Sequence, residues 1–403
     1  MNDNVAGHGP NAIAELSRYR RAMLVAVLIS SGPLMGLIIV GVAPILPMLA
    51  HEYGGDAKAA WIAQLLLTVP SAGIMLGGPL TGWLVERFGP RRVMTYGLAS
   101  YIVAGGIGMI TLEPHILLPA RFVAGLGAVA VATASMAVLG AEFEEGERAK
   151  ILGYQGAVGS LFGIVGVLLA GEIAEGFGIK ANFALYLGAA IVLGMAVAAM
   201  PLRLTKAPRK STDAPSSQLL LGLWPLYFLY TLIFCASFMP SVQLGFLLTV
   251  DGVTSVAIIS RVLAGSAIGT AAGSWAFSIL GSKIGHGFAS IIALVLWSAG
   301  LLAIGMRPGV VWTSAGAVVT GIGFGLFMPY AASLLLRKAA PEVRGRAMGL
   351  FYTAIYLGDF VSPFMTMPIR DAIGVHGLFS VTGGAIGVAA LIKAAAGSRR
   401  GAC

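Results

Sequence analysis

The chain repeats one pattern of glycines, prolines and arginines at a constant spacing of 196 residues. The paired positions are Pro44 and Pro240, Gly73 and Gly269, Gly77 and Gly273, Gly89 and Gly285, Gly125 and Gly321, Gly127 and Gly323, Arg148 and Arg344, and Gly153 and Gly349. Because the spacing does not drift, the two halves have equal length. The repeat therefore predicts two halves built on one helical plan.

The composition places both halves in a membrane. Hydrophobic residues make up 57% of the chain and charged residues 11%, against about 25% charged in an ordinary soluble domain. The mean hydropathy is +0.88. Cys235 and Cys403 are the two cysteines, so no disulfide framework is expected.

Apolar runs of about 18 residues or more are candidates for helices that span a bilayer. The expected spans are 22–50, 57–85, 93–111, 115–141, 150–172, 181–202, 218–248, 253–280, 287–305, 310–336, 346–369 and 372–393. We therefore expect an all-α integral membrane protein with twelve transmembrane helices in two pseudo-symmetric six-helix bundles. The predicted parts are a tail (1–21), a first bundle (22–202), a linker (203–217), a second bundle (218–393) and a second tail (394–403).

The distribution of basic residues predicts the orientation. If both termini are cytoplasmic, the inner segments hold 20 of the 26 Lys and Arg residues, which satisfies the positive-inside rule. We therefore expect a multi-pass protein of the bacterial inner membrane with its N- and C-termini in the cytoplasm. The net charge of +9 then reflects topology, and no contiguous basic face for nucleic acid is expected.

Two pseudo-symmetric halves in a membrane protein indicate a transporter with its substrate site between them. Two glycine stripes support relative movement of the halves. The first holds Gly156, Gly159, Gly163 and Gly166, and the second holds Gly265, Gly269 and Gly273. Small residues let helices approach closely in lipid, so the stripes predict either a surface on which the bundles rock or ordinary packing between fixed helices.

The loop after the second span combines glycines with an acid and several bases. Its residues are Gly82, Glu86, Arg87, Gly89, Arg91 and Arg92. The glycines permit a tight turn, and the charged groups can pair across helix ends. This loop resembles the signature of the major facilitator superfamily, with Glu86 where the family usually has Asp. The resemblance implies twelve helices, a central cavity and alternating access by rocking bundles.

Two further segments refine the resemblance. Arg121, followed by Gly125 and Gly127, resembles the helix-4 pattern of the superfamily. The element from Pro44 to Pro47 is similar to twelve-helix drug–proton antiporters. The helix-5 pattern of such exporters is matched in part, because Ile164 stands where their proline would be.

Asp359 is the most informative charged residue inside a predicted span. From Arg346 it lies thirteen residues along the helix, which places it about 20 Å into the membrane. An ionisable group at that depth costs about 2.5–3.5 kcal/mol and needs a reason. A carboxyl group there suits reversible protonation, so Asp359 is predicted as a proton-coupling site or a counter-charge for a cationic substrate; the alternative is a structural partner for an arginine.

Two arginines also lie inside spans. Arg121 is predicted about 8 Å below the outer boundary, as an electrostatic modulator of Asp359, with snorkelling or a bond to Glu113 as the alternatives. Arg261 is predicted to bind an anionic substrate or to pair with Asp359, with Asp251 or lipid phosphate as the alternative partners. The other candidates for the substrate cavity are Tyr352, Tyr356, Gln64, Gln155, Tyr230, Phe234 and Phe327.

Several classes of chemistry leave no pattern in the sequence. No nucleotide-binding loop is present, no histidine has the spacing of a metal site, and no hydrolase or redox constellation is visible. We therefore expect no enzyme, no cofactor and no metal. The expected partners are a small-molecule substrate, protons and membrane lipids, and the protein is expected to be a monomer.

The preferred function is secondary active transport of a small organic molecule by proton-coupled antiport, in the direction of efflux. The first alternative is an importer or exchanger of an organic anion or carboxylate, in which Arg121 and Arg261 clamp the substrate. A remote alternative is an integral-membrane enzyme. In the repeat, Asp359 matches Gly163, Arg121 matches Ala317 and Arg261 matches Leu65, so each charge occurs in one half alone.

Overall fold

The computed structural model describes residues 18–200, 222–280, 286–306, 309–339 and 344–400, and these contain helices and no strand. The predicted linker at 203–217 lies outside the described residues. In chain order the α-helices are α1 (Arg18–Val40), α2 (Leu46–Glu52), α3 (Ala57–Phe88), α4 (Pro90–Gly106), α5 (Pro114–Glu142), α6 (Glu145–Phe177), α7 (Ile179–Asn182), α8 (Ala189–Ala199), α10 (Trp224–Val250), α11 (Val256–Leu280), α12 (His286–Met306), α13 (Val310–Lys338) and α14 (Arg344–Arg400). The all-α membrane architecture is confirmed.

Ten helical segments of the described chain are long and apolar enough to cross a membrane. Two features explain the difference from twelve predicted spans. Helix α4 has 17 residues, just under the length of a counted span. Helix α14 covers the last two predicted spans, which follow each other without a loop and are separated by a kink at Gly374, where φ is 76°.

Local sequence accounts for several helix boundaries. The Asp56 carboxylate accepts a hydrogen bond from the amide of Ala59 (2.6 Å) and so caps the start of α3. Helix α3 ends at Gly89, whose φ of 84° suits glycine, and Pro90 then starts α4 at a position that needs no amide hydrogen.

The repeat predicted from the sequence is visible as equivalent helix crossings. A Cβ added to Gly125 would lie 2.2 Å from the carbonyl oxygen of Pro70, and one added to Gly321 would lie 2.1 Å from that of Ser266. Pro70 and Ser266 are themselves 196 residues apart. The contact of α5 with α3 therefore recurs between α13 and α11.

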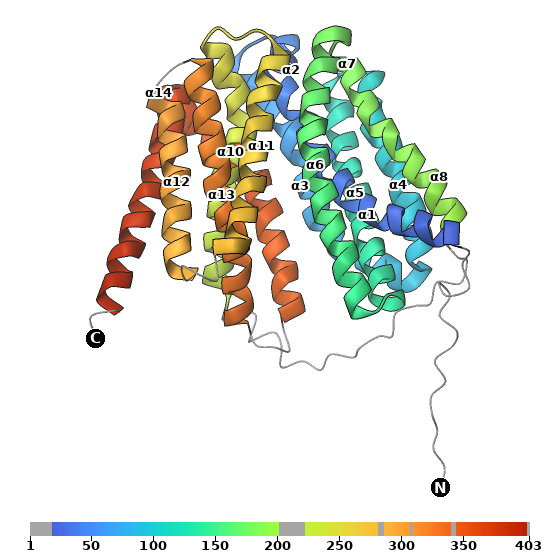
Figure 1. Cartoon of the computed structure of the whole chain (residues 1–403). Coiled ribbons are helices and arrows are strands. Elements are labelled where there is room, and N and C mark those ends of the chain that lie inside the picture. Colours follow the sequence, from blue (N-terminus) through green and yellow to red (C-terminus); the bar gives the residue numbers. More distant parts are fainter. Residues whose placement is uncertain (1–17, 201–221, 281–285, 307–308, 340–343, 401–403) are drawn as a thin grey trace.

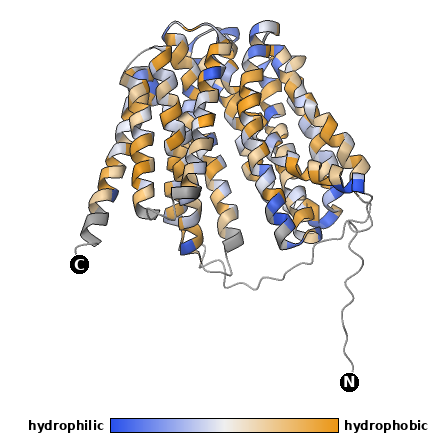
Figure 2. Cartoon of the chain, in the orientation of Figure 1, coloured by the Kyte–Doolittle hydropathy of each residue, from blue (hydrophilic) through white to orange (hydrophobic). Residues whose placement is uncertain are grey.

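The helices form two bundles, α1–α8 and α10–α14, placed side by side (Figure 1). We call the end where α8 finishes and α10 begins the linker face, and the end where α6 finishes and α11 begins the contact face. Figure 1 shows the ribbons of the two bundles approaching each other at the contact face and diverging toward the linker face. Apolar residues cover the length of the helices (Figure 2), as a bilayer requires.

Where glycines of the two stripes contact another helix, that helix belongs to the same bundle, whereas Gly156 and Gly163 would place no added Cβ within 4 Å of another atom. Gly269 and Gly273 lie against the backbone of α13, and Gly166 lies against side chains of α1. Helices α6 and α11 do meet, but they do so at the contact face, where Gly171 touches Ser260. The packing interpretation is therefore supported for Gly166, Gly269 and Gly273.

Candidate functional site

Asp359 lies in the first part of α14 and is fully buried. Neither of its carboxyl oxygens has a hydrogen-bond partner. Tyr356 and Tyr352 precede it on the same face of the helix, and their exposure rises toward the linker face, from half-buried Tyr356 to Tyr352 at 55%. The three side chains therefore form a line from the linker face to a buried acid.

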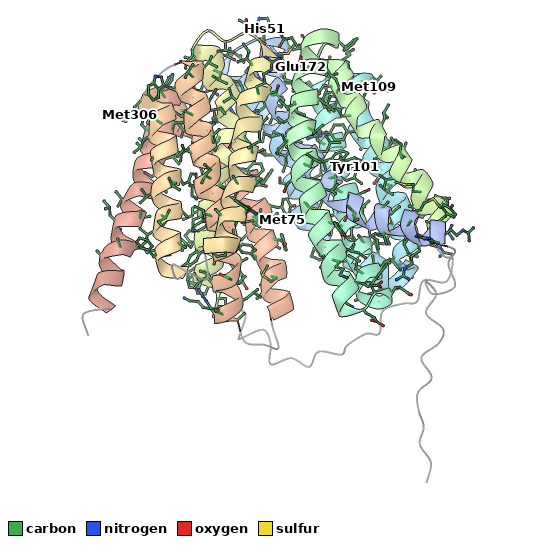
Figure 3. All side chains as sticks on the ribbon, in the orientation of Figure 1. His51, Met75, Tyr101, Met109, Glu172 and Met306 are labelled. Carbon is green, nitrogen blue, oxygen red and sulfur yellow. The ribbon has the colours of Figure 1, made fainter. Side chains whose placement is uncertain are left out.

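Ser71 of α3 faces Asp359 from the first bundle. The Ser71 hydroxyl is also fully buried, and it is close enough to interact with the carboxyl, although the two do not complete a hydrogen bond of standard geometry. One turn further toward the linker face, Met75 lies between the two bundles (Figure 3). The acid thus sits at the boundary of the bundles, where a relative movement would change its surroundings.

A polar seam joins the bundles on the contact-face side of Asp359. We define it by Gln64 of α3, Gln243 of α10, and Thr366, Met367 and Arg370 of α14. Gln64 Nε2 donates to the Met367 sulfur (2.9 Å), and Gln243 Nε2 donates to Gln64 Oε1 (3.0 Å) and Thr366 Oγ1 (3.3 Å). Arg370 Nη1 donates to Gln243 Oε1 (3.2 Å).

Of the residues in this polar seam, Gln64 is a predicted cavity residue, whereas Arg370 falls one residue beyond the predicted span 346–369. The structure instead holds the Arg370 guanidinium 4.6 Å from the ring centre of Phe246. Trp61 and Phe364 add an edge-to-face contact between the bundles, with ring centres 4.8 Å apart. The repeat gave no signal for this seam, since such contacts depend on how the two halves meet.

Arg121 is fully buried inside the first bundle. Its Nε donates to the carbonyl of Leu66 (3.0 Å), and its other nitrogens donate to the carbonyl of Ile38 and to the Tyr186 hydroxyl. These partners belong to α3, α1 and the turn before α8. Arg121 neither snorkels nor bonds Glu113, and it makes no hydrogen bond to Asp359; it ties three segments of one bundle together.

Arg261 lies on an exposed surface at the contact face. It forms an ion pair of 2.8 Å with Glu172 of α6, and both side chains are more than half exposed. Figure 3 shows Glu172 near that end of the first bundle. Asp251, the alternative partner predicted for Arg261, is instead bonded to His376. Arg121 and Arg261 therefore do not form one clamp in this conformation.

Three aromatic candidates for the substrate cavity are buried in the core of the second bundle. Tyr230, Phe234 and Phe327 are each at most 5% exposed, and Tyr230 donates to the carbonyl of Ala331 (2.8 Å). The rings of Phe234 and Phe351 meet edge to face, with centres 5.6 Å apart. In this conformation each of the three is covered by other aromatic side chains, so none of them lines an open cavity.

Gln155 of α6 donates to the Ser31 hydroxyl of α1, inside the first bundle. In the signature loop, Gly82 and Arg92 lie at the linker face; Arg91 donates to the carbonyl of Val197 (3.1 Å), and Arg87 stacks over Trp83 and Phe88. Within the described chain, Glu86 makes no ion pair. The predicted pairing of acid and bases across the helix ends is thus replaced by backbone and aromatic contacts.

No group of three or more His, Cys, Asp or Glu side chains that could hold a metal ion occurs among the described residues. The site is a single carboxyl group at a helix interface, with hydroxyl, thiol and aromatic neighbours. It has the parts to exchange a proton or to meet a charged or polar group of a substrate, and it lacks a nucleophile paired with a base.

The sequence profile described as the Major Facilitator Superfamily matches residues 24–363. The puromycin resistance protein pur8 of Streptomyces alboniger is 32% identical over 132 residues, which cover 32% of this chain and 25% of that protein. The match to the methylenomycin A resistance protein of Bacillus subtilis, at 28% identity, covers 40% of this chain and 34% of that protein. The chain thus spans a quarter to a third of these relatives.

A longer match is to the multi-drug resistance efflux pump PmrA of Streptococcus pneumoniae, 25% identical over 375 residues, 87% of this chain and 90% of that protein. Among solved structures, the nucleoside transporter NupG has a TM-score of 0.71 at 14% identity, over 94% of this chain and 99% of that chain. The human organic anion transporter MFSD10 has a TM-score of 0.67 at 18% identity, over 92% and 99%. At these identities the structures show a shared fold.

Proposed function

Because the chain belongs to the major facilitator superfamily, it is a membrane transporter, and we propose that it exports a small organic molecule across the bacterial inner membrane in exchange for protons. The observation that carries this proposal is the buried carboxyl of Asp359, which lies between the bundles and has no partner. A group that binds and releases one proton at that position couples proton movement to bundle movement. No covalent chemistry is part of the proposal.

The charges around the site favour this proposal over an anion carrier. Arg121 has its donors engaged by Leu66, Ile38 and Tyr186, and Arg261 is paired with Glu172 on the surface. A carboxylate substrate near Asp359 would meet a carboxyl group and no free cation. The substrate that this arrangement favours is neutral or positively charged.

Arg121 supports the site from a distance. Its hydrogen bond to Leu66 holds α3 at a point five residues before Ser71. Its hydrogen bond to Ile38 holds α1 against α5, the helix that carries Arg121. The role that these contacts support is positioning of the α3 surface that meets Asp359. Arg121 makes no hydrogen bond to Asp359 in this conformation. Its predicted electrostatic influence on Asp359, which would act through space, stays part of the proposal.

The distribution of Lys and Arg supports a cytoplasmic linker face. With that orientation, the conformation described here is closed toward the outside by the polar seam and diverges toward the cytoplasm. The relatives named as resistance proteins and efflux pumps support the outward direction of transport. Export in exchange for protons would begin when the substrate reaches the line of Tyr352, Tyr356 and Asp359 from the linker face.

The test is transport in proteoliposomes with an imposed pH gradient, using ethidium as a cationic probe and benzoate as an anionic one. Ethidium movement should depend on the gradient and should be lost in Asp359→Asn. The control is Asp371→Asn, which removes an exposed carboxylate from the same helix and should leave transport intact. Unchanged gradient-driven transport in Asp359→Asn would rule out the proton site, and benzoate transport that is lost in Arg261→Ala would favour the anion carrier.

A further inference from the structure

Helices α3 and α14 face each other across the boundary of the bundles in one antiparallel register. Helix α3 runs from the contact face to the linker face, and the first part of α14 runs back (Figure 1). Gln64 bonds Met367, and Ser71, seven residues further along α3, interacts with Asp359, eight residues earlier on α14. A step along α3 toward the linker face is therefore matched by a step back along α14.

On the linker-face side of Asp359, the same register opposes three pairs of residues, each helix presenting one face. The pairs are Met75 and Tyr356, Gly78 and Tyr352, and Gly82 and Gly349. We call the space between these six residues the slot; Figure 3 shows Met75 between the two bundles. A Cβ added to any of the three glycines would meet no atom within 4 Å, and the Tyr352 ring is 55% exposed. The slot is therefore open from the linker face as far as Tyr352.

Helix packing does not explain the glycines at the mouth of the slot. Glycine in the middle of a helix is destabilising relative to alanine. Gly125 has a packing reason, because it admits the backbone of a neighbouring helix. Gly78 precedes Pro79, a position at which larger residues are disfavoured in a helix. Gly82 and Gly349 have neither reason, and what they provide is open space.

The inner end of the slot carries the one charge of the two facing segments. Residues 59–85 of α3 and 347–369 of α14 contain no Lys, Arg, His or Glu and a single Asp, which is Asp359. Its carboxyl is fully buried and has no hydrogen-bond partner. Buried polar groups nearly always have a partner, so an unpartnered acid at the end of an open space points to an occupant that comes and goes. The charge that a carboxylate favours in that occupant is positive.

The walls of the slot suit a flat aromatic group. Tyr352 and Tyr356 are one turn apart on the same helix face, and aromatic faces attract cations. The Met75 thioether makes favourable contacts with aromatic rings, and Gly78 leaves the backbone of α3 bare opposite Tyr352. Seven residues separate Tyr352 from Asp359, about 10 Å along the helix, so a ligand that covers both tyrosines brings its inner edge toward the acid.

We propose that the slot is the substrate-binding site of this conformation and that it selects flat aromatic cations. The ligand lies between the tyrosine rings of α14 and the glycine backbone of α3, with its positive charge toward Asp359. The inference rests on the proposed function, since it gives the exported molecule a site and a shape. A cation of the same charge that is not flat does not fit between Tyr352 and Gly78, so shape adds to charge in setting the specificity.

The experiment measures equilibrium binding to the whole protein in lipid nanodiscs, at constant pH and without a gradient. Ethidium and proflavine are cations with a flat ring system, and their binding is followed by fluorescence polarisation. Tetraphenylphosphonium carries the same charge on a molecule that is not flat, and its binding is measured by competition with ethidium.

The variants change the walls of the slot and leave Asp359 in place. Tyr352→Leu removes the ring and Tyr352→Phe keeps it. Gly349→Leu adds a side chain one turn from Tyr352 on the same face, where it covers the ring. The controls are Tyr96→Leu, at an exposed tyrosine of α4, and Gly194→Leu, at an exposed glycine of α8 with no atom within 4 Å of an added Cβ. Thermal unfolding verifies that every variant is folded.

Tyr352→Leu should raise the ethidium Kd by about three- to tenfold, the worth of one aromatic contact, and Gly349→Leu should raise it by a similar factor. Tyr352→Phe and the two controls should stay within about twofold of the parent protein. Tetraphenylphosphonium should bind about tenfold more weakly than ethidium, because it overfills the slot, and its Kd should not respond to Tyr352→Leu.

Three results would overturn the proposal. The first is a parent protein that binds neither ethidium nor proflavine, and the second is an ethidium Kd that is unchanged in Tyr352→Leu or in Gly349→Leu. The third is tetraphenylphosphonium binding that equals ethidium binding and is weakened by Tyr352→Leu in the same way, which would remove selection by shape.

Gradient-driven transport in Asp359→Asn judges the proposed function separately. If that transport is lost while Tyr352→Leu and Gly349→Leu bind ethidium like the parent protein, the proton site stands and the slot is wrong. If the two slot variants bind ethidium more weakly while Asp359→Asn keeps gradient-driven transport, the slot stands and the proton site is wrong.

Discussion

The Glu175 carboxylate, at the end of α6, accepts a hydrogen bond from the backbone amide of Ala257, at the start of α11 (2.6 Å). The same oxygen accepts from the Ser255 hydroxyl (2.7 Å). A helix of the second bundle is therefore capped by a side chain of the first. Helix starts carry free amides and a positive dipole end, so a carboxylate there stabilises the contact.

Replacing Glu175 should loosen the contact face. Glu175→Gln keeps an acceptor and loses the charge, whereas Glu175→Ala loses both, so closure should decrease in the order parent, Gln, Ala. The distance between spin labels on Phe177→Cys and Val250→Cys, at the exposed ends of α6 and α10, measures it in a background of Cys235→Ala and Cys403→Ser. Glu113→Ala, which removes an exposed carboxylate near His115 within the first bundle, is the control and should have no effect.

Arg261 and Glu172 should behave as a pair. Because both side chains are exposed, their ion pair is screened by salt and contributes little in isolation. Arg261→Ala and Glu172→Ala should each shift closure slightly, the double variant should shift it no further, and high salt should remove the effect. A much larger loss of transport in Arg261→Ala than in Glu172→Ala would instead indicate a direct substrate contact.

The repeated glycine crossings predict matched instability in the two halves. Gly125→Ala and Gly321→Ala should each lower stability by about 1–3 kcal/mol, because the added methyl group meets a backbone carbonyl that cannot move freely. Gly140→Ala in α5 meets no atom within 4 Å and should be neutral or stabilising. Thermal unfolding in detergent compares the three, and equal stability of all of them would contradict the crossing geometry.

Arg121 should be required for the shape of the first bundle. Arg121→Lys retains the charge but cannot reach all three acceptors, so stability should fall by about 1–3 kcal/mol. Arg91→Lys, whose parent side chain makes one hydrogen bond at the surface, should change stability by about 0.5 kcal/mol or less. If Arg121→Lys unfolds like the parent protein yet loses proton coupling, its main role is electrostatic.

Tyr53, between α2 and α3, predicts a loss of stability in alkali. Burial, with the nearby Glu113 and Glu52 carboxylates, raises the pKa of its hydroxyl to about 12. Since the folded protein holds this proton more tightly than the unfolded chain, stability is complete below pH 10 and falls as the pH rises toward 12. Tyr53→Phe should reduce that fall, and unfolding curves at pH 9 and pH 11 measure the difference.

The sequence was sufficient for the architecture because its signals are local or periodic. Apolar runs set the spans, and the constant spacing of Gly125 and Gly321 predicted that the halves share one plan. The structure adds why the spacing is kept: each glycine admits the backbone of one neighbouring helix. The junction at Gly374, by contrast, could not be predicted from the sequence, because a single residue of positive φ joins the two spans and no polar loop marks the boundary.

The candidate site was only partly predictable. The depth of Asp359 along its helix followed from counting residues, and its burial followed from the cost of a charge in the membrane. Ser71 could not be selected, because a serine in a membrane helix is common and its partner lies in the other half. The surroundings of Phe234 and Arg261 could not be predicted for the same reason: the sequence gives the residues of each helix but not the neighbours that cover them or pair with them.

The single-residue junction at Gly374 determines how a movement of the helix that carries Asp359 would reach the rest of the second bundle. The helix that carries Asp359 passes into the last helix of the chain without an intervening loop, and Gly178, 196 positions earlier, forms a similar junction with a φ of 86°. A loop would absorb a tilt of the Asp359 helix, whereas a one-residue joint passes it on as rotation about one backbone angle. If Asp359 is the proton site, as we propose, a tilt of its helix would be passed directly to the final helix of the described chain.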